Sequence, residues 1–330
     1  MLTIDALQYS NWSRAVFDAM RRGGLDCAHV TIAYHETCVE TLRNIGAWNR
    51  LFELHGDLIM RAGCAEDINA AAAAGKTAIV FGFQNCSPIE DDYALVEIFH
   101  ALGVRFMQLS YNNQSPLAAG CYEARDSGVT KFGKQVIDEM NRVGMVIDMS
   151  HSAERSTLDA IDYSSRPIAI THANPSSFAD VPRNKSDAVL KALAGRGGML
   201  GLSLYPPHLK HGSDCTRESF CTMAARTAEL MGVEHLGIGS DLCSNQPAAV
   251  LAWMRDGRWR KPAGAGDGAG KNTANAAPQW PPQPAWFESA ADYPGLADGL
   301  AQAGFSAAEV ERVMGRNWLD FFAASFGPAA

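Results

Sequence analysis

The sequence predicts an α/β fold, a (β/α)8 TIM-like barrel, and two observations carry that prediction. The chain contains eight apolar segments of strand length, which is the number of parallel strands that closes such a barrel. Between most of them lie helix-length stretches with apolar residues three and four apart, such as 134–142 and 186–193. Strands that alternate with helices pair in parallel through right-handed crossovers. The predicted strands are 3–7, 29–33, 78–83, 105–110, 145–150, 168–171, 199–204 and 236–240.

The length of the chain fits one such domain. Its 330 residues accommodate a barrel of about 250 residues together with insertions. A doubly wound sheet is the alternative, but that fold places a glycine-rich phosphate-binding turn after an early strand. Residues 82–85 (GFQN) do not have that pattern. We therefore expect a single domain over residues 1–330.

Two further segments follow the eighth strand. Residues 264–285 are rich in glycine and proline and predict a flexible insertion. The insertion is either a flap over the barrel mouth or a surface loop without a function, and Trp280 and Trp286 favour docking of part of it. Residues 306–322 then predict a C-terminal helix capped by Ser306.

Composition and charge exclude several classes of partner. A formal net charge of -8 and a pI of about 5.6 argue against a general nucleic-acid-binding surface. No apolar run approaches the roughly 18 residues of a membrane helix, and the first residues lack the basic and apolar regions of a signal peptide. We expect a cytoplasmic protein that acts on a small-molecule substrate, with neither nucleic acid nor membrane as a partner.

Polar side chains follow most of the predicted strands. In a parallel barrel the carboxyl ends of the strands meet on one rim, and this rim carries the chemistry. Imidazole nitrogens are good zinc ligands, and a carboxylate nearby serves as a third ligand or as a base. A single histidine on this rim is more often a structural residue whose nitrogens are hydrogen-bonded within the protein. Two histidines after consecutive strands favour a functional site. The rim residues are Tyr9, Gln84, Tyr111, His151, His172, Tyr205 and Asp241.

Other histidines have a plainer interpretation. His208 and His211 lie three residues apart in a proline-containing loop, a pattern that predicts surface residues rather than ligands. The histidines at 29, 35, 55, 100 and 235 are interpreted as structural.

Several motifs resemble one known family. Residues 146–151 (VIDMSH), 167–172 (PIAITH), 183–184 (RN) and 237–241 (GIGSD) are similar in sequence and spacing to the membrane (renal) dipeptidases, peptidase family M19. The resemblance extends over nearly the whole chain. It implies a TIM-like barrel related to the amidohydrolases, hydrolysis of dipeptides at a two-zinc centre, and a homodimer.

The resemblance assigns roles to four matching residues. His151 and His172 correspond to the ligands of the second zinc, and Asp241 to the family's proton-handling aspartate. Arg183, next to Asn184, corresponds to the arginine that holds the substrate's carboxylate.

Other positions depart from the family pattern. The family's first strand ends in Asp-Gly-His-Asn-Asp, whose histidine and last aspartate bind the first zinc, but here Leu7 and Tyr9 stand in their places. The carboxylate that bridges the two metals falls on Gln84, and the substrate-contacting histidine on Tyr111. We expect the first zinc position to be empty and one Zn2+ per chain at the second.

The expected ligand set is His151, His172 and Gln84, with Asp241 and Glu123 as further candidate ligands. The substrate-binding residues expected beside it are Arg183, Tyr111, Asn184, Tyr9 and Glu123. The phenols of Tyr9 and Tyr111 either fill the vacated ligand space or receive a cationic group of the substrate.

Three functional hypotheses follow. The first is a one-metal hydrolase that cleaves a small carboxylate-bearing dipeptide, amide or related C–N substrate, with Asp241 moving the proton. The second is a metal-free enzyme that uses histidine and aspartate acid–base chemistry. The third is a non-catalytic descendant of the dipeptidases that binds a small ligand.

Overall fold

A computed structural model describes residues 1–257 and 279–327 of the chain. Eight parallel strands close into a barrel, because β1 pairs with β2 on one side and with β9 on the other, and β2 pairs directly with β4. The predicted TIM-like fold is therefore confirmed. The barrel strands are β1 (Ile4–Gln8), β2 (Cys27–Ala33), β4 (Thr77–Phe83), β5 (Val104–Gln108), β6 (Val146–Asp148), β7 (Ala169–Ala173), β8 (Met199–Leu202) and β9 (Leu236–Ile238).

One short strand was not predicted. β3 (Ile59–Arg61) pairs in parallel with the first half of β4, opposite Thr77 to Ile79, whereas β5 pairs with the second half of β4. Three residues are too few for a periodic signal, so no pattern in the sequence predicts this strand. The strand lies beside the barrel and does not enter its closed ring of eight.

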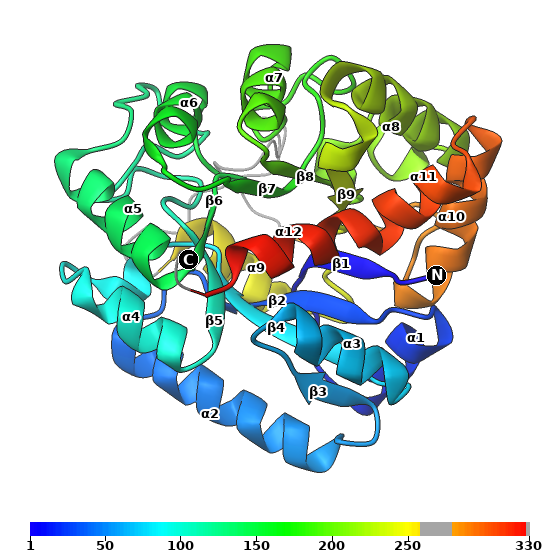
Figure 1. The fold of residues 1–330 in the computed structure, drawn as a ribbon, viewed down its shortest axis with the longest axis horizontal. Coiled ribbons are helices and arrows are strands. Elements are labelled where there is room, and N and C mark those ends of the chain that lie inside the picture. The colour runs from blue at the N-terminus through cyan, green and yellow to red at the C-terminus, as the bar shows by residue number, and fades with distance from the viewer. Residues whose placement is uncertain (258–278, 328–330) are drawn as a thin grey trace.

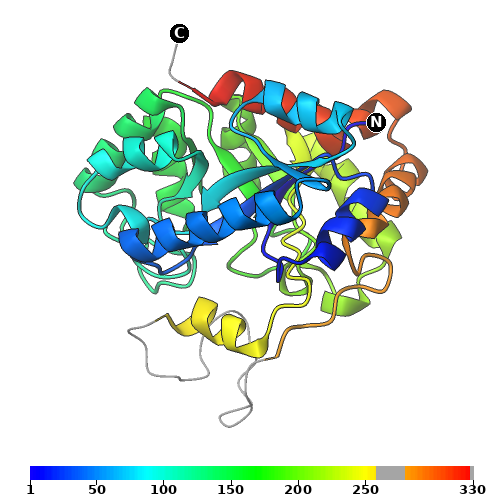
Figure 2. The same cartoon turned by 90° about the horizontal axis from the view of Figure 1, so that it is seen from below.

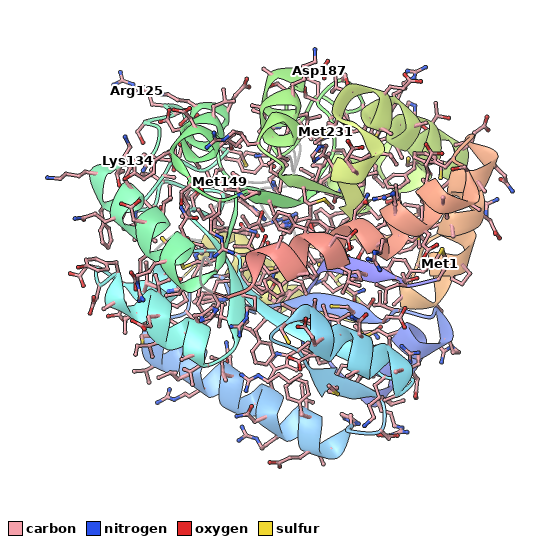
Figure 3. All side chains as sticks on the ribbon, viewed as in Figure 1. Met1, Arg125, Lys134, Met149, Asp187 and Met231 are labelled. Atoms are coloured by element: carbon pink, nitrogen blue, oxygen red, sulfur yellow. The ribbon has the colours of Figure 1, made fainter. Side chains whose placement is uncertain are left out.

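The helices form a ring outside the barrel (Figure 1). The predicted segments 134–142 and 186–193 fall within α5 and α7. Charged residues such as Arg125, Lys134 and Asp187 project outward, whereas Met149 lies buried in the middle (Figure 3). No helix in the described ranges is long and apolar enough to cross a membrane. The ring contains α1 (Arg14–Arg22), α2 (Cys38–Leu54), α3 (Ala65–Ala73), α4 (Ala94–Ala101), α5 (Lys131–Val143), α6 (Glu154–Tyr163), α7 (Asp187–Gly195), α8 (Arg217–Met231) and α10 (Tyr293–Gln302).

The amino end of the barrel is closed by the C-terminal helices. The predicted helix over 306–322 begins at a capping box between Ser306 and Glu309, as expected. It is then interrupted by a π-helical turn, Arg312–Arg316, which separates α11 (Ala307–Glu311) from α12 (Asn317–Ser325). α12 crosses the barrel (Figure 1), and the indole of Trp318 donates to the carbonyl of Ile238 at 3.1 Å.

The carboxyl end of the barrel faces the opposite way, toward α9 (Ala248–Asp256) (Figure 2). Much of the predicted insertion 264–285 lies outside the described residues, which resume at 279. Trp280 of that segment and Trp286, which directly follows it, make hydrogen bonds to the body of the protein. Trp280 donates to the carbonyl of Pro247 at 3.1 Å, and Trp286 donates to the carbonyl of Cys215 at 2.7 Å.

A glycine in β9 makes the close approach of α12 possible. A Cβ on Gly237 would lie 2.1 Å from Nε1 of Trp318, whereas a Cβ on Gly195 would meet nothing within 4 Å. We expect Gly237→Ala to lower the free energy of unfolding by about 1–3 kcal/mol through overpacking. The matched control Gly195→Ala should stay within about 1 kcal/mol of the wild type. Urea unfolding followed by circular dichroism measures both, and equal midpoints for the two variants would contradict this account of the packing.

Candidate active site at the carboxyl end of the barrel

Three predicted residues meet at the carboxyl ends of β4, β6 and β7. His172 lies within β7, His151 lies in the turn that follows β6, and Gln84 directly follows β4. The Nε2 atoms of the two histidines are 3.0 Å apart, and Oε1 of Gln84 is 2.9 Å from Nε2 of His151. All three side chains are buried. The barrel therefore brings together the donor atoms that the sequence predicts as one group.

The other ring nitrogen of His151 fixes its tautomer. Nδ1 lies 2.7 Å from the amide oxygen Oδ1 of Asn112, which can only accept a hydrogen bond. Nδ1 of His151 therefore carries the proton in the neutral ring. Its Nε2 presents a lone pair toward His172 and Gln84.

The tautomer of His172 follows from a chain of hydrogen bonds. Its Nδ1 lies 2.8 Å from Oγ1 of Thr171, and that hydroxyl donates its single proton to Oδ2 of Asp148 at 2.6 Å. Thr171 Oγ1 must therefore accept from Nδ1 of His172. The Nε2 of His172 likewise presents a lone pair.

Gln84 is oriented by its amide nitrogen. Nε2 donates to Oγ1 of Thr31 at 2.8 Å and to the phenol oxygen of Tyr34 at 2.9 Å, which turns Oε1 toward His151. The lone pair on Nε2 of His151 thus faces two others, on Oε1 of Gln84 and on Nε2 of His172, without a proton between them. Such an arrangement is repulsive by itself, and a cation placed among the three atoms would relieve it.

The histidines are also held in the form that binds a metal. Burial lowers the pKa of His151 well below its usual value, and the positive charge of Arg183 lowers it further. The pKa of His172 is lowered in the same direction by the same two causes. Both rings are therefore neutral near pH 7, as ligation requires.

The end of β1 provides no comparable ligands. Leu7 is fully buried in the barrel, and Tyr9 packs the edge of its ring against Tyr34 at a centroid distance of 4.7 Å. Over residues 1–257 and 279–327, no three side chains of histidine, cysteine, aspartate or glutamate come together as a metal-binding group. Beside the two histidines lies the neutral amide of Gln84, not a carboxylate.

Asp241 follows β9 in an unusual backbone conformation. Its φ is +57°, in the left-handed region that few non-glycine residues adopt, and its amide donates to the carbonyl of Leu7 at 3.0 Å. Burial raises the pKa of Asp241 to about 7, although Arg183 opposes the rise. A carboxyl group that titrates near neutral pH can both accept and return a proton.

Arg183 and Tyr111 complete the surroundings of the histidines. The guanidinium group of Arg183 is buried and donates to the carbonyls of Ser150 and His172, so it is attached to the segments that carry both rings. The ring of Tyr111 stacks on His151 at a centroid distance of 4.1 Å. Arg183 supplies a fixed positive charge and Tyr111 a flat wall.

These side chains enclose a cavity of about 30 Å3, enough for about one water molecule. Leu251 and Met254 of α9 cover it from outside. The cavity is lined by Gln84, Tyr111, Asn112, Tyr122, His151, Arg183, Tyr205, Pro207, His208, Asp241, Cys243, Leu251 and Met254.

Three predicted substrate-binding residues do not line this cavity. Glu123 is exposed, and its carboxylate accepts from the amide of Gln114 at 2.7 Å, so it lies away from the histidines. Asn184 is buried but turned toward the backbone, donating to the carbonyls of Ala179 and His208. Tyr9 is occupied in packing against Tyr34. Their roles as substrate-binding residues stay predictions.

One residue that the sequence placed on the surface lies in the cavity wall. His208 is only 4% exposed and ends a short 3-10 turn, Pro206–His208, that folds inward after β8. Its sequence neighbour His211 is exposed. The two adjacent prolines and the apolar Leu209 were the only local signals, and neither distinguishes an inward turn from a surface turn.

Comparison of the sequence with known proteins gives a family match. The membrane dipeptidase family, peptidase family M19, matches residues 10–251. Dipeptidase tcpJ of Claviceps purpurea is 28% identical over 289 residues, covering 86% of this chain and 59% of that protein. An uncharacterized dipeptidase of Schizosaccharomyces pombe is 31% identical over 209 residues, covering 61% of this chain and 50% of that protein. The chain spans about half to three fifths of the length of these curated relatives.

Solved structures are similar over the full chain. An amidohydrolase from Pseudomonas aeruginosa is 32% identical, with a TM-score of 0.91 over 98% of this chain and 96% of that one. A metallopeptidase from Rhodobacter sphaeroides, crystallised with a phosphinate mimic of the dipeptide L-Ala-D-Ala, has a TM-score of 0.80 at 15% identity. The second likeness, over 98% of this chain and 99% of that one, concerns the fold alone.

The raised pKa of Asp241 predicts a trade between stability and function. In the metal-free protein the folded state favours the protonated carboxyl of Asp241. Below pH 3.8, the unfolded pKa, this group does not lower the free energy of unfolding. As the pH rises from 3.8 through about 7, the free energy of unfolding falls because the buried carboxyl must ionise. We expect Asp241→Asn to stabilise the chelator-treated protein above pH 7 by a few kcal/mol, at most about 4. The gain should shrink as the pH falls from 7 and vanish near pH 4. Asparagine also tolerates the left-handed backbone. Urea unfolding of both proteins between pH 4 and pH 8 measures the difference, and a difference independent of pH would contradict this origin.

Proposed function

Since the chain belongs to the membrane dipeptidase family, peptidase family M19, we propose that it is a hydrolase that cleaves a small carboxylate-bearing dipeptide, amide or related C–N substrate at a centre with one zinc ion. The observation that carries the proposal is that Nε2 of His151 lies 2.9 Å from Oε1 of Gln84 and 3.0 Å from Nε2 of His172, with lone pairs on all three atoms. The hydrogen bonds to Asn112, Thr171 and Tyr34 hold these lone pairs in place, which favours a resident cation over acid–base chemistry by the two rings alone.

The donor set fits zinc. His151, His172 and the amide oxygen of Gln84 would hold the ion, giving the three protein ligands of a catalytic site. Zinc bound there supplies a positive charge that polarises a carbonyl group and makes water more acidic. The end of β1 does not fit a second ion, because Leu7 offers no donor atom and Tyr9 packs against Tyr34. We therefore derive no step through a second metal.

The protein's own residues account for the other parts of hydrolysis. Arg183 pairs with the carboxylate of the substrate and fixes its position. Water adds to the scissile carbonyl carbon, Asp241 accepts a proton from it, and the same carboxyl returns the proton to the amide nitrogen as the C–N bond breaks. The products are a carboxylic acid and an amine, and transfer of the acid proton to the amine leaves a carboxylate and an ammonium group.

Access to the centre requires movement at the mouth. A cavity of about 30 Å3 holds about one water molecule and cannot hold a dipeptide. Leu251 and Met254 lie over it, so we propose that α9 moves outward when substrate enters. The homodimer and the cytoplasmic location that the sequence suggested stay predictions, and analytical ultracentrifugation measures the first.

Metal content tests the centre directly. Protein prepared with zinc and then desalted is expected to hold one zinc per chain by plasma emission spectrometry. His151→Ala is expected to hold almost none, because it leaves two protein ligands. The control His211→Ala changes an exposed histidine and should keep one zinc. Two ions per chain in the wild type, or none, would contradict the proposed centre.

Changes at Gln84 test its place as the third ligand. Gln84→Glu replaces a neutral oxygen by a charged one and should bind zinc at least about tenfold more tightly, since charge-assisted contacts are roughly twice as strong. Gln84→Leu keeps a similar volume without a donor and should bind zinc more weakly than the wild type. Competition with a chelating dye gives the three dissociation constants. Equal affinities for all three proteins would remove Gln84 from the ligand set.

A further inference from the structure

We propose that His208 is a substrate-contacting residue of this centre, which donates a hydrogen bond from Nε2 to the oxygen that gains negative charge during hydrolysis. The inference rests on the proposed function and names a part of it. His208 shares the cavity wall with His151, Arg183 and Asp241. It comes from the β8 side of the barrel, whereas His151 and His172 come from β6 and β7.

The protonation of His208 can be worked out from its neighbours. Its Nδ1 lies 2.8 Å from Oγ of Ser203, and the same Oγ accepts from the amide of Tyr205 at 3.2 Å. Within the described parts of the chain, Nδ1 of His208 is the one acceptor recorded for the hydroxyl proton of Ser203. When that proton is donated to Nδ1, the ring proton resides on Nε2.

Nε2 of His208 is therefore a donor. Among residues 1–257 and 279–327 it is not one of the fully buried polar atoms that lack a hydrogen bond, so it is open to the cavity rather than sealed in the core. The side chain is 4% exposed and lines the cavity. A donor that faces the cavity can give a hydrogen bond to water or to a bound ligand. This is the opposite arrangement to His151 and His172, whose Nε2 atoms both present lone pairs.

The ring is also rigidly held and neutral. The carbonyl of His208 accepts from the side-chain amides of Asn174 at 3.2 Å and Asn184 at 3.0 Å. Tyr205 packs edge-on against the ring at a centroid distance of 5.2 Å. Burial lowers the pKa of His208 well below its usual value, with help from Arg183 and Lys185, so the ring donates a hydrogen bond but does not give up a proton.

The chemistry of such a donor suits the addition step. When the water oxygen bonds to the carbonyl carbon, the π electrons of the C=O bond move to its oxygen, and they return when the C–N bond breaks. A fixed N–H directed at that oxygen stabilises it most at its highest charge. Removing one donor of this kind commonly lowers kcat by about 10²–10³-fold. Asn184, which holds the backbone of His208, acts as a positioning residue.

The chain offers a matched control three residues away. His208→Phe removes the donor but keeps a flat ring, His208→Gln keeps an N–H near the place of Nε2, and His211→Phe makes the same change at an exposed histidine. On the best substrate of a dipeptide and acylated amino-acid panel, we expect His208→Phe to lower kcat about 100-fold with KM changed less than threefold. His208→Gln should recover at least tenfold of that loss, and His211→Phe should match the wild type. All variants should keep the wild-type zinc content.

A binding measurement separates this inference from the proposed function. A phosphinate dipeptide mimic carries negative oxygens where the charge develops, so its affinity by calorimetry should fall at least tenfold in zinc-loaded His208→Phe and stay unchanged in His211→Phe. Equal phosphinate affinity or equal kcat in these two variants would overturn the role of His208. A wild type that hydrolyses nothing on the panel would overturn the proposed function, and the phosphinate comparison would still decide about His208.

If His208→Phe does not fold, His208→Gln with unchanged kcat and Ser203→Ala with unchanged phosphinate affinity would together overturn the inference.

Discussion

The geometry of the site depends on the buried carboxylate of Asp148 at the end of β6. It accepts from the amide and hydroxyl of Ser150, from the amide and hydroxyl of Thr171, and from Nε2 of Gln108 at 2.8 Å. These donors come from the carboxyl ends of β5, β6 and β7. A buried charge is costly, and this number of donors compensates for its desolvation. Asp148 accepts the hydroxyl proton of Thr171, so Thr171 must accept a hydrogen bond from Nδ1 of His172. The lone pair of His172 therefore lies on Nε2.

On the opposite side of the barrel a second buried carboxyl group also accepts several hydrogen bonds and holds the strand ends in place. Asp5 in β1 accepts from the amide of Ser240 at 2.7 Å and from its hydroxyl, and also from Gln8 and Tyr293. Burial raises the pKa of Asp5 although these hydrogen bonds oppose the rise. Ser240, held in this way, directly precedes Asp241, whose φ of +57° lies in the left-handed region. Each half of the site is thus held by one buried carboxyl group, Asp148 or Asp5. These hydrogen bonds are present although Leu7 and Tyr9 stand where the family has metal ligands.

The sequence predicted the barrel well and its mouth less well, for physical reasons. Strands of a closed parallel barrel are covered on both faces, so they read as continuous apolar runs that are easy to find. Gln84, His151 and His172 follow such runs closely, and the strand geometry alone brings them together. His208 and Glu123 lie in longer loops, where nothing local distinguishes an inward turn from an outward one. The interruption at Arg312–Arg316 was missed because a π-helical turn keeps nearly the same apolar spacing as the helix around it.

The mouth of the barrel differs from the core in how it is held. The core consists of interlocked apolar side chains such as Trp318 and Phe106, which cannot move separately. α9 is attached by hydrogen bonds at its far end, from the indole of Trp253 to Glu36 at 3.2 Å and between the ring of His35 and the carbonyl of Met254 at 3.1 Å. Such hydrogen bonds can be exchanged for hydrogen bonds with water at little net cost, although outward movement also exposes the buried side chains of Leu251 and Met254. The helix also lies on the outer side of the barrel mouth (Figure 2). When the cavity must grow to admit a substrate, α9 is therefore the element that can yield, while the carboxylate-held histidines stay in place.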